Sequence, residues 1–395
     1  MCRRLSSISA FSLCLLVLPA NSVAQNPTST PVEVLYIVTS STIQTYNVDP
    51  QTGLATQEGQ PINLPVTYAI VVPSPDDHFL YVSSGYAQKV DRLWVYKTDA
   101  TGTPQFPAVQ ELTFPLSTSP ISIDPNGTLA YVAQSSKNSH GDTLAQVLLF
   151  DVDPTTGMLS QSKVVTSFKP NGPCITGINS PGSFGLNGFG PRGNELYDGW
   201  GCSYYDTGGS TYYTQKINQG TGTLGPPVQV FAVSDNELSG QLNQVNFTKD
   251  ALLYFDIPYD YNQGYASISI YPLSGGTTPL FTCTATMLEA CGYGYWTTPD
   301  PSGNYIFINI GDTTQITHLD LAAKTITDTG YFVAGYYQNF SPDGSLVYSK
   351  ISSTSAPYFL DIYTFDEATG AVTTTSESSI AVQASDYTVV PAVRK

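Results

Sequence analysis

Basic side chains are scarce in this sequence of 395 residues: Lys and Arg together number 15, against 31 for Asp and Glu, so the formal net charge is -16. An acidic chain repels phosphate backbones, which argues against nucleic acid as a partner. Only 12% of the residues are charged, whereas Gly, Pro and Tyr number 33, 28 and 27. Gly and Pro interrupt helices and aromatic rings suit a pleated surface, so the composition predicts an all-β chain with many turns.

Motifs of catalysis and metal binding are missing as well. The sequence contains no G-x-S-x-G, no H-E-x-x-H and no D-x-D-x-D-G loop. Histidine occurs only as His78, His140 and His318, and the arginines beyond the first 24 residues are Arg92, Arg192 and Arg394. We therefore expect neither a cofactor nor a metal site, and no ready set of acid and base residues.

The first 24 residues have the features of an export signal. Arg3 and Arg4 form a short basic region, residues 10–18 form an apolar run, and Ala24 is a small residue suited to cleavage before Gln25. The apolar run is too short to span a membrane comfortably, and no later segment is apolar over a spanning length. The mature chain is thus expected to be secreted or periplasmic, without an integral membrane segment.

Three parts of the chain follow from this interpretation. Residues 1–24 are the signal peptide, residues 25–33 a flexible leader, and residues 34–395 a single folded domain. The short signal and the style of the later repeats are typical of bacterial proteins.

Export also determines how the remaining cysteines are interpreted, because disulfides form in oxidising compartments. Cys174, Cys202, Cys283 and Cys291 allow three pairings, of which their order along the chain favours Cys174–Cys202 and Cys283–Cys291. A zinc site is the competing interpretation, but it lacks a C-x-x-C pair and enough histidine.

Two turn signatures alternate along the chain and indicate a repeat architecture. In the first, a turn cluster precedes a short strand that usually carries Tyr; it occurs as SPDDHFLYV (74–82), DPNGTLAYV (124–132), GPRGNELYD (190–198), TKDALLYF (248–255), DPSGNYIF (300–307) and SPDGSLVY (341–348). In the second, a strand runs into Asp or Asn and then Thr-Gly, at 46–55, 95–104, 150–159, 216–225 and 363–372. The glycine of this second turn supplies the positive φ of a tight hairpin.

Each repeat therefore predicts four antiparallel strands, and the repeats recur every 40 to 65 residues or so, which is typical of propeller blades. Residues 35–53 supply a second and third strand without an inner one, and residues 385–393 supply a lone inner strand. We expect a seven-bladed β-propeller of four-stranded blades, closed by pairing of the N- and C-terminal strands, which removes open edges.

The blade motifs SPDDHFLYV, DPTTGML, DEATGAV and SPDGSLVY resemble those of the lactonase-type seven-bladed propellers, which include bacterial phosphogluconolactonases and fungal muconate cyclases. The motifs are shared with other bacterial propellers of the YVTN-repeat kind. The resemblance implies a lactonase-like hydrolase or cycloisomerase acting on a sugar-acid lactone, with His, Glu and Arg around a central channel. No such set can be matched in this sequence, so catalytic residues do not carry over.

Strand order places the histidines and the turn carboxylates. The turns of the first signature lie on the face opposite the loops where propeller sites usually open, so His78 and Arg192 point away from a site, and His318 falls in a third strand. His140 remains as the one catalytic candidate, with a plain surface residue as its alternative. The turn residues Asp76, Asp124, Asp300 and Asp343 are expected to accept backbone hydrogen bonds rather than to bind calcium.

Tyrosine gathers in the loops of the expected functional face. The candidate ligand-binding residues are Tyr204, Tyr205, Asp206, Tyr259, Asp260, Tyr261, Tyr293, Tyr295, Tyr336 and Tyr337. Rings beside carboxylates and amides suit glycans or protein loops, although tyrosines also pack between blades. The sequence thus favours a secreted binding or scaffold module whose ligand is a glycan or a protein; a lactonase-like enzyme acting on a small lactone, and a purely structural surface protein, are the alternatives.

Overall fold

The computed structural model describes residues 32–66, 69–84, 92–116, 118–140, 142–170, 183–189, 193–202, 209–234, 244–248, 250–256, 267–273, 278–293, 297–351, 356–374, 378–385 and 387–394. All of them belong to the second of two compact units, Pro31–Lys395. The expected signal peptide and most of the leader lie outside the described residues. Within the described part of the chain, no helix is long and apolar enough to cross a membrane.

Antiparallel strands build this unit. The strands β1 (Val32–Thr39), β2 (Thr42–Val48) and β3 (Ala55–Asn63) form one sheet with β29 (Tyr387–Arg394), here named the closing sheet. The next two sheets are β4 (Ala69–Pro73), β5 (Phe79–Ser84), β6 (Arg92–Lys97) and β7 (Gln110–Thr113), then β8 (Ser122–Ile123), β9 (Leu129–Lys137), β10 (Thr143–Asp151) and β11 (Lys163–Phe168).

The later sheets repeat the same order. They are β12 (Ser183–Phe189), β13 (Glu195–Cys202), β14 (Gly209–Lys216) and β15 (Val228–Ser234); β16 (Gln244–Phe247), β17 (Ala251–Asp256), β18 (Ser267–Pro272) and β19 (Phe281–Thr284); and β20 (Thr297–Pro299), β21 (Tyr305–Ile310), β22 (Thr313–Asp320) and β23 (Thr325–Ala334). The last comprises β24 (Tyr337–Phe340), β25 (Leu346–Ile351), β26 (Tyr358–Asp366), β27 (Ala371–Thr373) and β28 (Ser379–Val382). A short helix, α1 (Ala290–Tyr293), follows β19.

The fold is an all-β propeller, but the prediction of seven four-stranded blades is wrong: six sheets have four strands and the last has five. The outer edge of this five-stranded sheet is divided between β27 and β28, which pair with different parts of β26. Between them the ladder is interrupted at Ile362, whose N–H donates to Ser378 O at 2.8 Å and whose carbonyl accepts from Thr374 Oγ1 at 3.0 Å. A fourth strand broken in this way is not encoded by a local turn signature.

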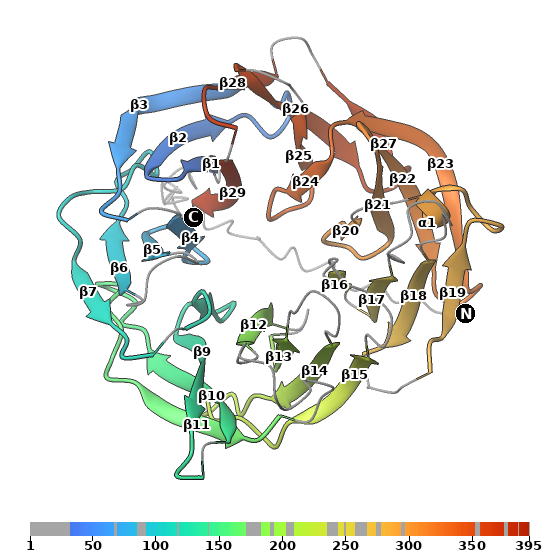
Figure 1. The fold of residues 1–395 in the computed structure, drawn as a ribbon. Coiled ribbons are helices and arrows are strands. Elements are labelled where there is room, and N and C mark those ends of the chain that lie inside the picture. The colour runs from blue at the N-terminus through green and yellow to red at the C-terminus, as the bar shows by residue number, and fades with distance from the viewer. Residues whose placement is uncertain are drawn as a thin grey trace, which may run out of the picture. The chain divides into compact units, whose positions relative to one another are not determined.

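The two ends of the unit pair as expected. β29 runs antiparallel to β1 in continuous register, from Val32 opposite Arg394 to Thr39 opposite Tyr387. Figure 1 shows the red β29 beside the blue β1, and the sheets following one another around a ring with β4, β16, β20, β24 and β29 toward its centre. Pairing the chain ends within one sheet covers the inner edge of β1, which would otherwise present unpaired backbone groups.

The first-signature turns are held by their own side chains. Asp124 Oδ1 accepts the N–H groups of Thr128 and Leu129, both at 2.7 Å, and Asp300 Oδ1 accepts Tyr305 N–H at 2.7 Å. In two further turns, Asp76 Oδ1 accepts the N–H of His78 at 3.2 Å, and Asp343 Oδ1 accepts the N–H of Ser345 at 3.0 Å. The prediction that these four carboxylates serve the turns is confirmed.

Neighbouring sheets are tied together by a repeated tyrosine contact. Tyr81 on β5 donates to the carbonyl of Gly157 at 3.1 Å, and Tyr131 on β9 donates to that of Gly222 at 2.8 Å. Both glycines are in third-to-fourth-strand turns of the following sheet, with φ of 70° and 68°. The apolar side chains of adjacent sheets pack in shared clusters; one contains Tyr81, Val132 and Phe150. Second strands thus carry the Tyr of the sequence signature into the interface between sheets.

One of the two expected disulfides is present. Cys283 on β19 and Cys291 in α1 are both fully buried and joined, with their Cα atoms 5.7 Å apart. The Cys174–Cys202 pairing stays a prediction, because Cys174 and the side chain of Cys202 lie outside the described residues.

Candidate functional site

The propeller has two faces, which are named here by what joins the strands. The turn face carries the first-to-second-strand turns at 74–78, 124–128, 300–304 and 341–345 and the glycine turns described above. The loop face carries the second-to-third-strand connections, such as 138–142. The sequence predicts a site on the loop face, whereas the two pockets described below lie on the turn face.

The larger pocket, here named the mouth pocket, lies where four inner strands end. It has a volume of about 390 Å³. Phe189 ends β12, Thr248 follows β16, and β20 and β24 contribute their last residues together with the turns that follow them. The lining residues are Phe189, Thr248, Thr298, Pro299, Asp300, Pro301, Asn339, Phe340, Ser341 and Pro342. Because inner strands surround the axis of a propeller, this pocket is at the turn-face mouth of the central channel.

Several polar groups of the mouth pocket also hold the fold. Asn339 Nδ2 donates to Val389 O at 2.9 Å and so joins β24 to β29. Asp300, only 3% exposed, accepts from Tyr305 N–H through Oδ1 and from Ser302 N–H through Oδ2, at 2.7 and 3.0 Å. These bonds fix the orientation of the carboxylate of Asp300, which is one of the residues that line the pocket. Thr298, on β20, is half-buried.

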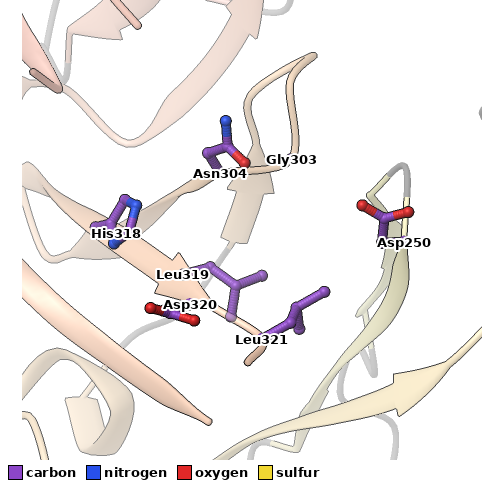
Figure 2. A pocket seen from close by; sticks show the side chains of 7 residues that line it. All are labelled: Asp250, Gly303, Asn304, His318, Leu319, Asp320 and Leu321. Atoms are coloured by element: carbon purple, nitrogen blue, oxygen red, sulfur yellow. The ribbon is translucent and has the colours of Figure 1, made fainter. Parts of the chain in front are cut away.

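The smaller pocket, the outer pocket, lies between the β16–β19 and β20–β23 sheets and has a volume of about 300 Å³. Figure 2 shows Asp250 on one side of it and His318 and Asp320 on the other, with Leu319 and Leu321 between them. The His318 ring packs edge-on against Tyr305, with centroids 5.3 Å apart, and Asp320 Oδ1 accepts Ala323 N–H at 2.8 Å. His318 is in a third strand, β22, as predicted, and its ring forms part of the packing between strands.

The structure places the other histidine candidates apart from both pockets. His140 is exposed in the loop 138–142, where its N–H donates to Asn138 Oδ1 at 2.9 Å. The nearby Asp142 accepts from Asn138 Nδ2 and Lys169 Nζ, at 3.1 and 2.9 Å, so both of its oxygens are occupied. His78 lies in its turn as predicted, 3.0 Å from Asp76.

Most of the tyrosine candidates lie outside the described residues: Tyr204, Tyr205, Asp206, Tyr259, Asp260, Tyr261 and Tyr295. Tyr293 falls in α1 and Tyr337 in β24 by their backbones. Tyr336 is half-buried, and its N–H donates to Lys350 O at 3.1 Å. The tyrosine-rich ligand face therefore stays a prediction.

Three buried carboxyl groups escaped prediction from the sequence. Burial raises the pKa of Glu33 to about 8, and burial raises the pKa values of Asp77 and Asp198 to about 7 each. Glu33 and Asp77 lie on opposite flanks of the closing sheet, near Tyr348 and Tyr36 respectively. A sequence signal existed for Asp77: it occupies the position that is Gly in SPDG, DPNG and DPSG, and it has a φ of 57°.

Comparison with solved structures finds the same architecture in bacterial proteins. A putative 6-phosphogluconolactonase from Bacteroides uniformis is 17% identical, with a TM-score of 0.57, over 91% of this chain and 99% of its own. A protein of the same description from Bacteroides fragilis is 16% identical, with a TM-score of 0.57, over 92% and 99%. A functionally unknown protein from Desulfotomaculum acetoxidans is 11% identical, with a TM-score of 0.51, over 89% and 99%.

At these identities the similarity is one of fold: the chain has a β-propeller like that of the Bacteroides proteins. No protein-family model matches the chain. No curated protein sequence matches it either.

Proposed function

We propose that this chain is a lactonase-like hydrolase that takes a small sugar-acid lactone into the mouth pocket. The observation that carries the proposal is a pocket of about 390 Å³ at the channel mouth. The fold around it matches the two Bacteroides proteins over 99% of the length of each of those chains. Small-molecule sites usually measure about 300 to 1,000 Å³ and combine apolar walls with a few polar groups. The partly exposed Phe189 offers a ring for a sugar face, and Thr298 offers a hydroxyl.

Asp300 is the candidate base, because it is the only ionisable side chain among the described lining residues. In lactone hydrolysis, water attacks the carbonyl carbon and gives up a proton to the base, the ring C–O bond breaks, and the ring oxygen takes a proton to yield the hydroxy acid. A carboxylate has about four lone-pair sites, of which Ser302 and Tyr305 occupy three. The remaining site is available to a water molecule in the pocket.

The test is acid release from glucono-δ-lactone and a panel of related lactones, followed in a pH-stat and corrected for the uncatalysed rate. Asp300→Asn should lower kcat at least about 100-fold, as expected for loss of a general base. Asp124→Asn is the matched control: it is in the equivalent DPNG turn, is 4% exposed, and is absent from the pocket lining. It should leave turnover unchanged.

Other outcomes would contradict the proposal. No turnover across the panel, or equal loss in both variants, would remove the hydrolase. Loss in His140→Ala but not in Asp300→Asn would move the site to the loop face. A glycan or protein bound by a chain without turnover, and lost in Tyr205→Ala or Tyr261→Ala, would instead support the binding module.

A further inference from the structure

At the interface between the closing sheet and the β4–β7 sheet, a tyrosine hydroxyl has two hydrogen-bond acceptors. The corresponding tyrosines at the next two interfaces have one acceptor each. Tyr36 Oη is 2.8 Å from Asp77 Oδ1 and 2.7 Å from Gly102 O, and all three residues are buried or nearly so. The corresponding Tyr81 and Tyr131 hydroxyls each bond to a single glycine carbonyl. The difference arises because the turn position of Asp77 is glycine in the next sheet, at Gly127.

A tyrosine hydroxyl has one hydrogen, so it cannot donate to two acceptors at once. If Asp77 is ionised, Tyr36 serves either the carboxylate or Gly102 O, and the other buried oxygen loses its donor. If Asp77 is neutral, its own O–H donates to Tyr36 Oη, and the Tyr36 O–H is free to donate to Gly102 O. Only the neutral form satisfies both short contacts, and an unsatisfied buried acceptor is costly.

Charged and titratable groups lie near Asp77 on each of the elements that pack against it. Arg394 on β29 donates to the backbone oxygen of Asp77 at 3.0 Å and to Thr98 Oγ1 at 2.7 Å, so its cation is partly engaged with neutral groups. Asp76 and His78 are in the same turn, Tyr36 is on β1, and Asp99 is in the turn of Gly102. Within the described part of the chain, Asp77 Oδ2 has no hydrogen-bond partner. Burial outweighs the Tyr36 hydroxyl and the Arg394 cation, which both favour the ionised form, and raises the pKa of Asp77 to about 7.

We propose that the protonation state of Asp77 controls the contact between the closing sheet and the β4–β7 sheet, and we name this residue the latch. Its neutral form stabilises the contact, and its ionisation weakens the contact. The folded pKa of about 7 is above the ordinary value of 3.8. The latch is therefore fully engaged below pH 4 or so, and its contribution is lost as pH rises through 7. That difference in pKa corresponds to a change of up to about a thousandfold in the equilibrium between closed and open chain.

The experiment compares the full chain with Asp77→Asn and Asp77→Gly at pH 5 and pH 8.5. Asn tolerates positive φ and supplies an N–H donor that does not titrate, and Gly restores the turn found elsewhere. Hydrogen exchange of β1, β29 and β5 amides is the local measurement. The exchange rates are first corrected for the intrinsic effect of pH. The increase in corrected rate from pH 5 to pH 8.5 should be at least tenfold larger in the wild type than in either variant.

Glu33→Gln is the matched control, because Glu33 is a buried carboxyl on the other flank of the closing sheet. It should leave the wild-type pH response of β5 unchanged. Equal pH responses in the wild type and both Asp77 variants would overturn the latch, and so would a β5 response that disappears in Glu33→Gln. Global unfolding in urea at both pH values shows whether a variant is folded before exchange is measured.

Discussion

The hydroxyl of Tyr131 lies 2.8 Å from the carbonyl oxygen of Gly222, a residue 91 positions later in the chain. The bond joins the second strand of one sheet to the glycine turn of the next, and Tyr81 repeats it with Gly157. The two sequence signatures are therefore complementary: the tyrosine of one is the donor for the glycine of the other. At these two interfaces, one repeat supplies a hydrogen-bond donor to the repeat that follows it.

Removing the hydroxyls tests how much these bonds stabilise the ring. Tyr131→Phe and Tyr81→Phe should each lower the free energy of unfolding by about 1 to 3 kcal/mol, since a buried carbonyl loses its donor. The two sites are in different interfaces, so the double variant should show the sum of the two effects. Tyr331→Phe is the control, because Tyr331 is 40% exposed on β23. Urea unfolding measures all four, and losses no larger than that of the control would contradict the role of the bond.

How far the sequence predicts this fold depends on how local the causes are. The turns are encoded locally, by Asp, Ser and Gly within five residues of one another, so strand order and ring closure could be predicted. The split between β27 and β28 could not, because it depends on hydrogen bonds around Ile362 rather than on a turn residue.

Buried charges and pockets were missed for the same reason. Asp77 looks like an ordinary polar turn residue, and its burial arises from Tyr36 and Arg394, which are 41 and 317 positions away. The mouth pocket is assembled from four inner strands between Phe189 and Pro342. Neither the residue types nor their spacing within one repeat predicts the burial of Asp77 or the assembly of the mouth pocket. The Asp at a glycine position was the only local signal.

Close packing at the glycine turns makes a second prediction. A Cβ at Gly157 would clash with the Phe79 ring and would sit at a φ of 70°. Gly157→Ala should therefore cost more than about 2 kcal/mol of stability, from overpacking and backbone strain together. Gly311→Ala separates these causes, since Gly311 has a φ of 63° but no atom within 4 Å of its Cβ position. It should cost about 1 kcal/mol, and equal losses in the two variants would contradict the packing argument.

The disulfide gives a third prediction, because it closes a loop with a sequence separation of 8 between two buried cysteines. In the chain-entropy treatment, a loop of this size contributes about 2 to 3 kcal/mol. A reductant should thus lower the Tm of the wild type by more than that of the Cys283→Ala, Cys291→Ala double variant, which keeps Cys174 and Cys202. Thiol counting of the unfolded protein, before and after reduction, checks that the bond was present. An unchanged wild-type Tm after complete reduction would contradict the prediction.

Asp198 makes the last prediction, on the pH dependence of stability away from the closing sheet. It is fully buried on β13, and Gln215 Nε2 donates to its Oδ2. Among the residues that the structure describes, neither its Oδ1 nor Gln215 Oε1 has a partner. Burial raises its pKa from 3.8 to about 7, so its contribution to stability is full below pH 4 and falls as pH rises through 7.

Asp198→Asn removes this titration and supplies an N–H donor among the unpaired oxygens. At pH 8 the variant should be more stable than the wild type by about 1 to 3 kcal/mol, with the difference vanishing or reversing at pH 4. Urea unfolding across this range measures it, with Asp151→Asn, at an exposed position on β10, as the control that should show no such crossover. A destabilisation that is the same at every pH would mean that the Asp198 carboxyl does not change its protonation on folding.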